Sequence, residues 1–272
     1  DQMAGKKEVD LLNSFAFPLP ITVIAEMLGI PGEDRDKFRK WTQVILFNPD
    51  QETNMSAIME FVMYMNAKIE EYQNNPADNI LSALVQAEED GDALDQMELM
   101  SMIFVLFVAG HETTVNLIGN GTLALMQHRD QFDLLRDHPE HIKTAVEEML
   151  RWNGPVECPT LRWAFEDVQI GDVQVAQGDI VLPSLLAANR DPAIFENPNT
   201  FDIMRTPNKH IAFGHGIHYC VGAPLARMEG AIAINALLER FPQIDLAVPE
   251  SSLEWTPSLL IHGMTKLPVT LT

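Results

Sequence analysis

Residues 212–222 constrain this chain more than any other stretch of it. They contain Gly214, Gly216, Gly222 and one cysteine, Cys220, and they lead directly into a segment of helical character. Glycine adopts backbone conformations that other residues avoid and lets another group approach the main chain closely. A cysteine just before a helix N-terminus lies near free N–H groups and the positive end of the helix dipole, which favour the thiolate. A thiolate in this position can ligate iron.

Two other interpretations of Cys220 compete with iron. The first is a small buried thiol in a glycine-rich turn, which is how most lone cysteines behave. The second is zinc, because His215, His218 and Cys220 lie close in sequence and are all competent ligands. Structural zinc sites usually draw pairs of ligands from two separate elements, whereas only one cluster is present here. The loop therefore favours iron over zinc.

The loop resembles a known cofactor site. Its pattern, Phe-x-x-Gly-x-His-x-Cys-x-Gly, resembles the haem-binding loop of the cytochromes P450. The resemblance implies haem b (iron protoporphyrin IX), with Cys220 as the axial ligand of the iron and His218 holding a propionate. The haem-binding residues that the resemblance implies in this loop are Phe213, Gly214, Gly216, His218 and Cys220.

A long apolar helix is predicted upstream of the loop. Asp95 and Glu98 have the spacing of a capping box, and the helix that they open should continue to about His128. Polar residues interrupt its apolar run at positions 111–114, and a buried polar group is costly without a partner. Either the helix has a functional break here, or a second helix begins at Thr113. A metalloprotease His-Glu-x-x-His motif is excluded, since the last position is not histidine.

The interrupted stretch, Ala-Gly-x-Glu-Thr-Thr, resembles the oxygen-activating groove in the central helix of the cytochromes P450. The resemblance implies that Glu112 and Thr113 are catalytic, holding water and passing protons during oxygen activation. It also implies that Ala109 and Gly110 border the haem pocket.

Glu148 and Arg151 lie at i and i+3 of a helix predicted over residues 139–151. Taken alone, such a pair is usually a surface ion pair that contributes little. Glu-x-x-Arg at this distance from the central helix is similar to another cytochrome P450 motif, in which the pair is structural. The resemblance implies Arg205 as its third member.

Residues 156–186 alternate in polarity and carry turn signals, which predicts a small β-sheet. The resemblance implies that Arg162 holds a haem propionate; otherwise it is an ordinary solvated strand arginine. It also implies that Val156 and Leu260 border the substrate pocket. Cys158 is expected to be structural.

Composition excludes several classes of protein. The formal net charge of −21 argues against a nucleic acid or an anionic membrane as partner. The two cysteines form no disulfide framework, which fits a reducing cytoplasm, and the polar opening residues are not a signal peptide. The apolar run over residues 97–110 is shorter than the ~20 residues of a membrane span. A soluble cytoplasmic protein is expected.

The resemblance covers residues 10–272 and implies one domain over 1–272, mainly α with small β-sheets: a cytochrome P450 fold that lacks its N-terminal portion. The sequence as a whole is similar to soluble bacterial members that hydroxylate polyketides and macrolides, with fatty-acid hydroxylases as near relatives. The implied function is a monooxygenase that inserts one oxygen atom from O2 into a small apolar organic substrate. Electrons would come from NAD(P)H through a reductase and a ferredoxin or flavodoxin. The alternatives are a catalytically inactive haem-binding or scaffold fragment, and the small zinc site.

Overall fold

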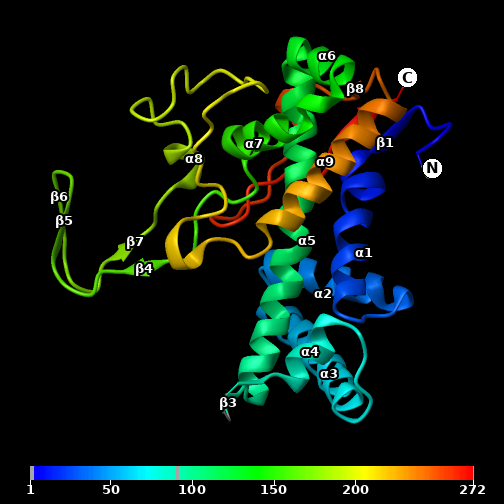
Figure 1. Cartoon of the computed structure of the whole chain (residues 1–272), viewed down its shortest axis with the longest axis vertical. Helices are drawn as coiled ribbons and strands as arrows, with labels where there is room; N and C mark the ends of the chain where they lie inside the picture. The colour runs from blue at the N-terminus through cyan, green and yellow to red at the C-terminus, as the bar shows by residue number, and fades with distance from the viewer. Residues whose placement is uncertain (1–2, 90–91, 272) are drawn as a thin grey trace. The chain divides into compact units, whose positions relative to one another are not determined.

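The computed structural model describes residues 3–89 and 92–271, which are mainly helical with small β-sheets. They form two compact units, each described here by itself. The first unit is built on Asp10–Val115, and the second holds Lys6–Val9 and the chain from Asn116 onward. The long helix α5 (Gln96–Gln127) contributes its first part to one unit and its second part to the other (Figure 1).

Helices make up most of the first unit. After a π-helical turn (Leu12–Ala16) come the four helices α1 (Pro18–Met27), α2 (Arg35–Phe47), α3 (Gln51–Asn74) and α4 (Ile80–Gln86). A 3-10 turn (Gly32–Asp34) precedes α2, and the short strands β2 (Glu88–Glu89) and β3 (Asp92–Ala93) pair antiparallel before α5.

Local sequence explains where these helices begin. The Asp50 side chain accepts a hydrogen bond from the N–H of Thr53 at the start of α3, and Asn79 does the same for Ser82 at the start of α4. Pro18 stands at the first position of α1, where its missing N–H costs nothing. Pro18 and Pro20 therefore both lie within α1.

Aromatic side chains form the centre of the first unit. The ring of Phe38, which is fully buried, lies 4.6–5.8 Å from the rings of Trp41, Phe61, Tyr64 and Phe107. Three of these contacts are edge-to-face, the arrangement that the charge distribution of aromatic rings favours. Helices α2, α3 and α5 are joined by this cluster.

The capping box at the start of α5 is confirmed. Asp95 accepts hydrogen bonds from the N–H groups of Met97 and Glu98 at 2.8 Å each, and the Glu98 carboxylate accepts from the N–H of Asp95 at 3.0 Å. The helix then runs without interruption to Gln127, which confirms the expected extent to about His128. A break near residue 111 and a separate helix beginning at Thr113 were wrong.

Among the residues that the structure describes, α5 is the one helix long and apolar enough to cross a membrane by length and composition. The expectation that its apolar run is too short for a span was therefore wrong on length. Half of its most apolar 18-residue window is buried within the protein, as in the core helix of a soluble protein.

The second unit combines four further helices with small sheets. The helices are α6 (Arg129–Asp137), α7 (Ile142–Asn153), α8 (Leu185–Ala188) and α9 (Ala223–Arg240). A three-stranded sheet has the order β1 (Glu8–Asp10), β9 (Pro268–Thr270), β8 (Asp245–Leu246). Two antiparallel pairs join β4 (Arg162–Trp163) to β7 (Ile180–Val181), and β5 (Val168–Ile170) to β6 (Val173–Val175). The alternating stretch thus forms two separate strand pairs, with β5 and β6 lying beyond β4 and β7 in Figure 1.

Glycines allow the helices of the second unit to pack closely. A Cβ atom added to Gly230 of α9 would lie 3.0 Å from Leu117 of α5, and one added to Gly121 of α5 would lie 2.7 Å from the sulfur of Met149 on α7. Both positions are tighter than ordinary van der Waals contacts. These two glycines let α5 approach α7 and α9, whose N-terminus follows the cysteine loop.

Candidate haem-binding site

The loop before α9 is held by its own backbone. The N–H of Cys220 donates to the carbonyl of Phe213 at 2.9 Å, and the N–H of Gly214 donates to the carbonyl of Ile211 at 2.8 Å. Gly214 has a φ of 75° and Gly216 a φ of 68°, in the left-handed region that favours glycine. A side chain at Gly214 would also lie 3.2 Å from the carbonyl of His218.

Gly222 differs from the other two glycines of the loop. Its φ is −82°, which any residue adopts, so the expectation of an unusual conformation there was wrong. It is the residue directly before α9, and an added Cβ would lie 3.8 Å from the sulfur of Cys220. That distance is an ordinary van der Waals contact, so a small side chain at this position would not clash with the thiol.

Cys220 is exposed, three residues before the first residue of α9. Its neighbours Ile217 and Val221 are 97% and 87% exposed, which is unusual for large apolar side chains. The loop therefore presents a thiol among apolar groups that nothing in the described part of the second unit covers.

The zinc interpretation of this loop is not supported by its geometry. Within the described residues, a single group of three or more possible metal ligands converges, and it consists of His138, Glu140 and His141. His215, His218 and Cys220 do not converge in this way.

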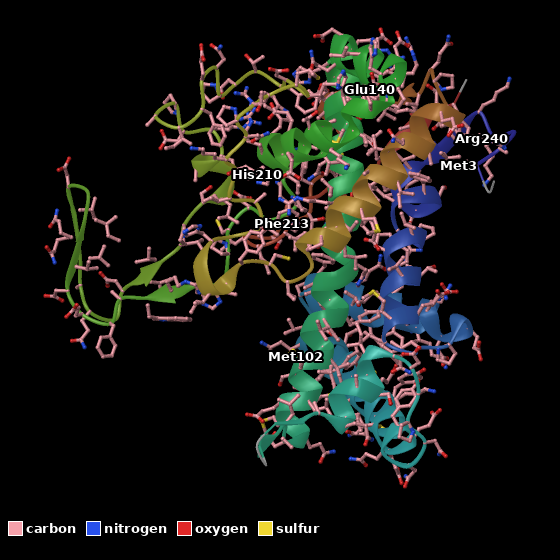
Figure 2. The ribbon with its side chains drawn as sticks, in the orientation of Figure 1. Met3, Met102, Glu140, His210, Phe213 and Arg240 are labelled. Atoms are coloured by element: carbon pink, nitrogen blue, oxygen red, sulfur yellow. The ribbon has the colours of Figure 1, made fainter. Side chains whose placement is uncertain are left out.

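A carboxylate network connects the loop to α7 and α9. Arg227 of α9 donates to both oxygens of Glu147 at 2.6 and 2.9 Å, and the His210 ring lies 2.9 Å from the same carboxylate. The guanidinium also lies 4.5 Å from the centre of the Phe213 ring and donates to the Tyr219 hydroxyl. Figure 2 shows His210 and Phe213 on the segment that leads into the loop.

The charged partners of Glu147 strongly favour its ionised form. Burial alone would raise the pKa of Glu147, but hydrogen bonds from His210 and Arg227 lower it to about 2. The same carboxylate raises the pKa of Arg227. No spacing rule links Glu147 to a residue 80 positions later, so this network was not predicted.

The second carboxylate of α7, Glu148, is fully buried and lies at the centre of a hydrogen-bond network. Arg151 donates to both of its oxygens at 2.7 Å, and Arg205 donates to both at 3.2 Å. The amide of Asn208 and the N–H of Asp202 add hydrogen bonds at 3.1 and 2.9 Å. The structure thus brings together the three residues expected to form a structural cluster.

Both arginines of this network also hold the backbone before the loop. The carbonyls that accept hydrogen bonds from Arg151 or Arg205 belong to Asn189, Glu196, Asn197, Pro198 and Thr200. Asn189 in turn accepts from the N–H of Ile211 through its side-chain oxygen at 2.8 Å. A buried charge therefore fixes the segment that precedes the cysteine loop.

The remaining predicted residues of the second unit lie in exposed or half-buried positions. Arg162 on β4 is exposed, and its guanidinium donates to the Thr160 hydroxyl at 2.7 Å. His218 is exposed in the 3-10 turn Gly216–His218. Val156 and Leu260 come from neighbouring segments, because Val156 bridges to Ile261 and the N–H of Glu157 donates to the Leu260 carbonyl.

The residues predicted to be catalytic lie on α5, in the first unit. The Thr113 hydroxyl donates to the carbonyl of Ala109, one turn earlier, at 2.8 Å. This bond satisfies the hydroxyl without ending the helix. Ala109 is exposed, whereas Gly110 is half-buried against α1, and an added Cβ would lie 2.9 Å from Cδ1 of Ile24.

His111, beside Glu112, is fully buried. Its Nδ1 lies 2.8 Å from the carbonyl of Phe107, and a carbonyl only accepts, so Nδ1 carries the proton. Nε2 is then a bare acceptor without a hydrogen-bond partner, 3.7 Å from a Glu112 oxygen. Burial lowers the pKa of His111 to about 4, so the ring is neutral.

Comparison with known proteins identifies the family. The family model described as cytochrome P450 matches residues 35–142 and 136–265. This chain belongs to the cytochrome P450 family. It is 48% identical to cytochrome P450 107B1 of Saccharopolyspora erythraea over 269 residues, 99% of this chain and 66% of that relative. It is 46% identical to the polyketide biosynthesis cytochrome P450 PksS of Bacillus subtilis, covering 100% of this chain and 67% of that relative.

Solved cytochrome P450 structures have the same fold. The structure of Bacillus subtilis PksS matches with a TM-score of 0.96 at 46% identity, covering 100% of this chain and 71% of that one. The tirandamycin C-bound monooxygenase TamI matches with a TM-score of 0.91 at 45% identity, covering 98% and 66%. The chain thus spans about two thirds of the length of the relatives that it matches. The P450 fold of the described residues agrees with the fold expected from sequence.

The cysteine loop fits the haem that this family implies. An exposed thiol beside a helix N-terminus is a suitable soft ligand for iron. The exposed side chains of Ile217 and Val221 suit the apolar face of a porphyrin. The exposed Arg162 and His218 are donors suited to carboxylates.

Proposed function

We propose that this chain carries the haem-thiolate centre of a monooxygenase that inserts one oxygen atom from O2 into a small apolar organic substrate. The observation that carries the proposal is the exposed Cys220, held by backbone hydrogen bonds directly before α9 and flanked by exposed apolar side chains. Haem b ligated by this thiolate would supply the oxygen activation, because cysteine ligation favours O–O cleavage.

Individual residues of the chain would position that cofactor and its substrate. Cys220 would ligate the iron, with the backbone of Phe213, Gly214 and Gly216 forming the loop around it. His218 and Arg162 would bind the propionates through charge-assisted hydrogen bonds. Ala109 and Gly110 would border the haem, and Val156 and Leu260 the substrate.

Glu112 and Thr113 would handle protons during the reaction. The Thr113 hydroxyl already donates to the Ala109 carbonyl, which leaves its oxygen lone pairs free to accept from a water molecule. Glu112 is an ionisable group one residue away, and proton transfer by such a positioned group contributes about 10²–10⁴-fold to a rate.

The names of the relatives support the proposed class of substrate. One is named for polyketide biosynthesis, and the solved structures include members bound to tirandamycin C and to myristic acid. We therefore propose a polyketide, macrolide or fatty-acid-like substrate and a cytoplasmic location. Electrons would come from NAD(P)H through a separate reductase and a ferredoxin or flavodoxin.

The test is the spectrum of the reduced carbon monoxide complex. Wild-type protein should show the thiolate-type spectrum, and Cys220→Ser should lose it while Cys158→Ser, at a buried thiol, keeps it. Wild-type protein that binds haem without that spectrum would overturn the assignment of Cys220. Product formation with surrogate redox partners then separates a working monooxygenase from an inactive haem-binding protein.

A further inference from the structure

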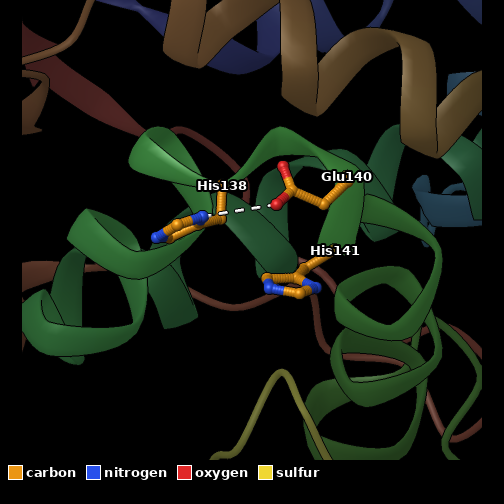
Figure 3. A group of neighbouring side chains, drawn as sticks. All are labelled: His138, Glu140 and His141. Atoms are coloured by element: carbon orange, nitrogen blue, oxygen red, sulfur yellow. Dashed lines mark hydrogen bonds and ion pairs between the residues drawn. The ribbon is translucent and has the colours of Figure 1, made fainter.

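A cluster of metal-binding side chains lies in the second unit, apart from the cysteine loop. His138, Glu140 and His141 each offer one ligand atom, and these atoms all lie within 4.8 Å of one another. The cluster occupies the short junction between α6 and α7, where a 3-10 turn (Pro139–His141) joins the two helices. Figure 3 shows the three side chains on one side of this turn.

We propose that His138, Glu140 and His141 form a surface site for a divalent transition-metal ion, with Zn²⁺ as its ordinary occupant. Two imidazoles and one carboxylate form a donor set that suits Zn²⁺, Ni²⁺ or Cu²⁺, whereas Mg²⁺ and Ca²⁺ prefer oxygen ligands alone. Water would complete the coordination, because two of the three side chains are exposed.

The distances are close to those that a metal requires. Ligand atoms about 2.0–2.2 Å from a tetrahedral Zn²⁺ lie about 3.3–3.5 Å from one another. Nδ1 of His138 and Oε1 of Glu140 are already 3.3 Å apart. The rings of His138 and His141 have their centres 5.8 Å apart and are tilted by 41°, so a small rotation of the exposed His138 ring would bring its nitrogen nearer.

The backbone under the cluster is fixed before any metal binds. The N–H of His138 donates to the Leu134 carbonyl at the end of α6, and the N–H of His141 donates to the His138 carbonyl. Pro139 lies between them and restricts the chain further. Only side-chain freedom is lost on binding, which lowers its entropic cost. A net charge of −21 also favours any cation near the surface.

The bound metal would join the C-terminal end of α6 to the start of α7. His138 is the residue directly after α6, and His141 is the residue directly before α7. Helix α7 carries both Glu147 and Glu148, whose networks hold the cysteine loop and the segment before it. The metal would therefore act as a structural clip on this helix, with no part in the oxidation.

Equilibrium dialysis of the tag-free chain against Zn²⁺, with zinc and protein both quantified, tests the site. Wild-type protein is expected to bind one zinc ion per chain. His138→Ala and His141→Ala are each expected to bind zinc at least about tenfold more weakly. Glu140→Gln should weaken zinc binding less than the histidine variants do, because the amide oxygen remains a ligand, although a poorer one than the carboxylate. Since His215 and His218 are exposed in the cysteine loop, His215→Ala is the matched control and should bind zinc as wild type does.

Two outcomes would overturn the proposal. One is a wild-type chain that takes up no zinc when dialysed against about 0.1 mM Zn²⁺, which would place any Kd well above the micromolar range. The other is uptake that survives the double variant His138→Ala/His141→Ala and disappears in His215→Ala. Circular dichroism of each variant shows whether the fold is kept, which is expected because the His138 ring is exposed and the His141 ring is only partly buried.

Discussion

Arg151 donates from Nε and Nη2 to the two oxygens of Glu148 at 2.7 Å each, and neither side chain has any exposed surface. Ion pairs in the interior lose the hydration of both partners, so they persist only where further hydrogen bonds satisfy the remaining donors and acceptors. Here Arg205 and Asn208 complete the carboxylate, and backbone carbonyls complete the guanidinium.

Removing one partner of this pair should destabilise the protein strongly. Glu148→Gln and Arg151→Met are each expected to cost about 3–5 kcal/mol of unfolding free energy, because each leaves the other charge buried and unpaired. The matched control is Arg136→Met, which breaks partly exposed pairs with Asp133, also at 2.7 Å, and with Asp137 at 2.9 Å. This loss is expected to cost at most about 1 kcal/mol. Urea unfolding of the three variants measures the difference. Equal losses would refute a special role for burial.

Glycine at position 110 is expected to stabilise the protein because it leaves room for Ile24, and not because it favours the helix. Alanine is the better helix former by about 1 kcal/mol, but its methyl group would lie 2.9 Å from Ile24 Cδ1. Overpacking of this kind costs about 1–3 kcal/mol. Gly110→Ala is therefore expected to destabilise wild type and to stabilise an Ile24→Ala background. A double-mutant cycle by denaturant unfolding tests this, and the same sign in both backgrounds would contradict it.

His111 should make stability depend on pH in acid. Its pKa is about 4 in the folded protein and about 6.5 when unfolded. The unfolded chain therefore binds the proton first, and stability present above pH 6.5 is lost as pH falls toward 4. The loss from this one group is roughly 3 kcal/mol. His111→Phe, which keeps a ring against Phe17 and Phe107, should have a shallower slope over that window. If the unfolding free energies of wild type and variant fall equally with pH, another group is responsible for the pH dependence.

Thr113→Ala should uncouple electron consumption from product formation while leaving haem content unchanged. Its hydroxyl bonds only to the Ala109 carbonyl among the contacts described for it, so its removal breaks no link between helices. Thr113→Ser keeps the hydroxyl and is the control. The ratio of product to NAD(P)H consumed, with hydrogen peroxide assayed in parallel, is the measurement. A ratio in the alanine variant equal to wild type would make Thr113 a packing residue.

Local patterns in the sequence predicted helices where the signal lies in neighbouring residues. The capping box at Asp95 and Glu98 was predicted correctly, because such a cap depends only on residues that are close in sequence. The extent of α5 to about His128 was also predicted, whereas the break near residue 111 was wrong, because the packing of His111 in the core is a tertiary effect.

The candidate site was predictable only where a motif is local. The loop around Cys220 was recognisable because its glycines and cysteine are consecutive. The pairing of Glu147 with Arg227, and the place that Gly110 leaves for Ile24, join segments distant in sequence. Helical periodicity could indicate which face of a helix is buried, but not which residue of another helix it meets.

The arginines at the Glu148 network bind the segment from Asn189 to Thr200 through its carbonyls, an atom that every residue type possesses. Substitutions in that segment should therefore be tolerated wherever the side chain is exposed, apart from Asn197 with its φ of 48°, since the recognised atoms stay in place. Insertion or deletion of a single residue is different, because it moves several carbonyls away from fixed guanidinium groups at once. The amino-acid sequence of this segment should accordingly vary among relatives, whereas its length should be constant.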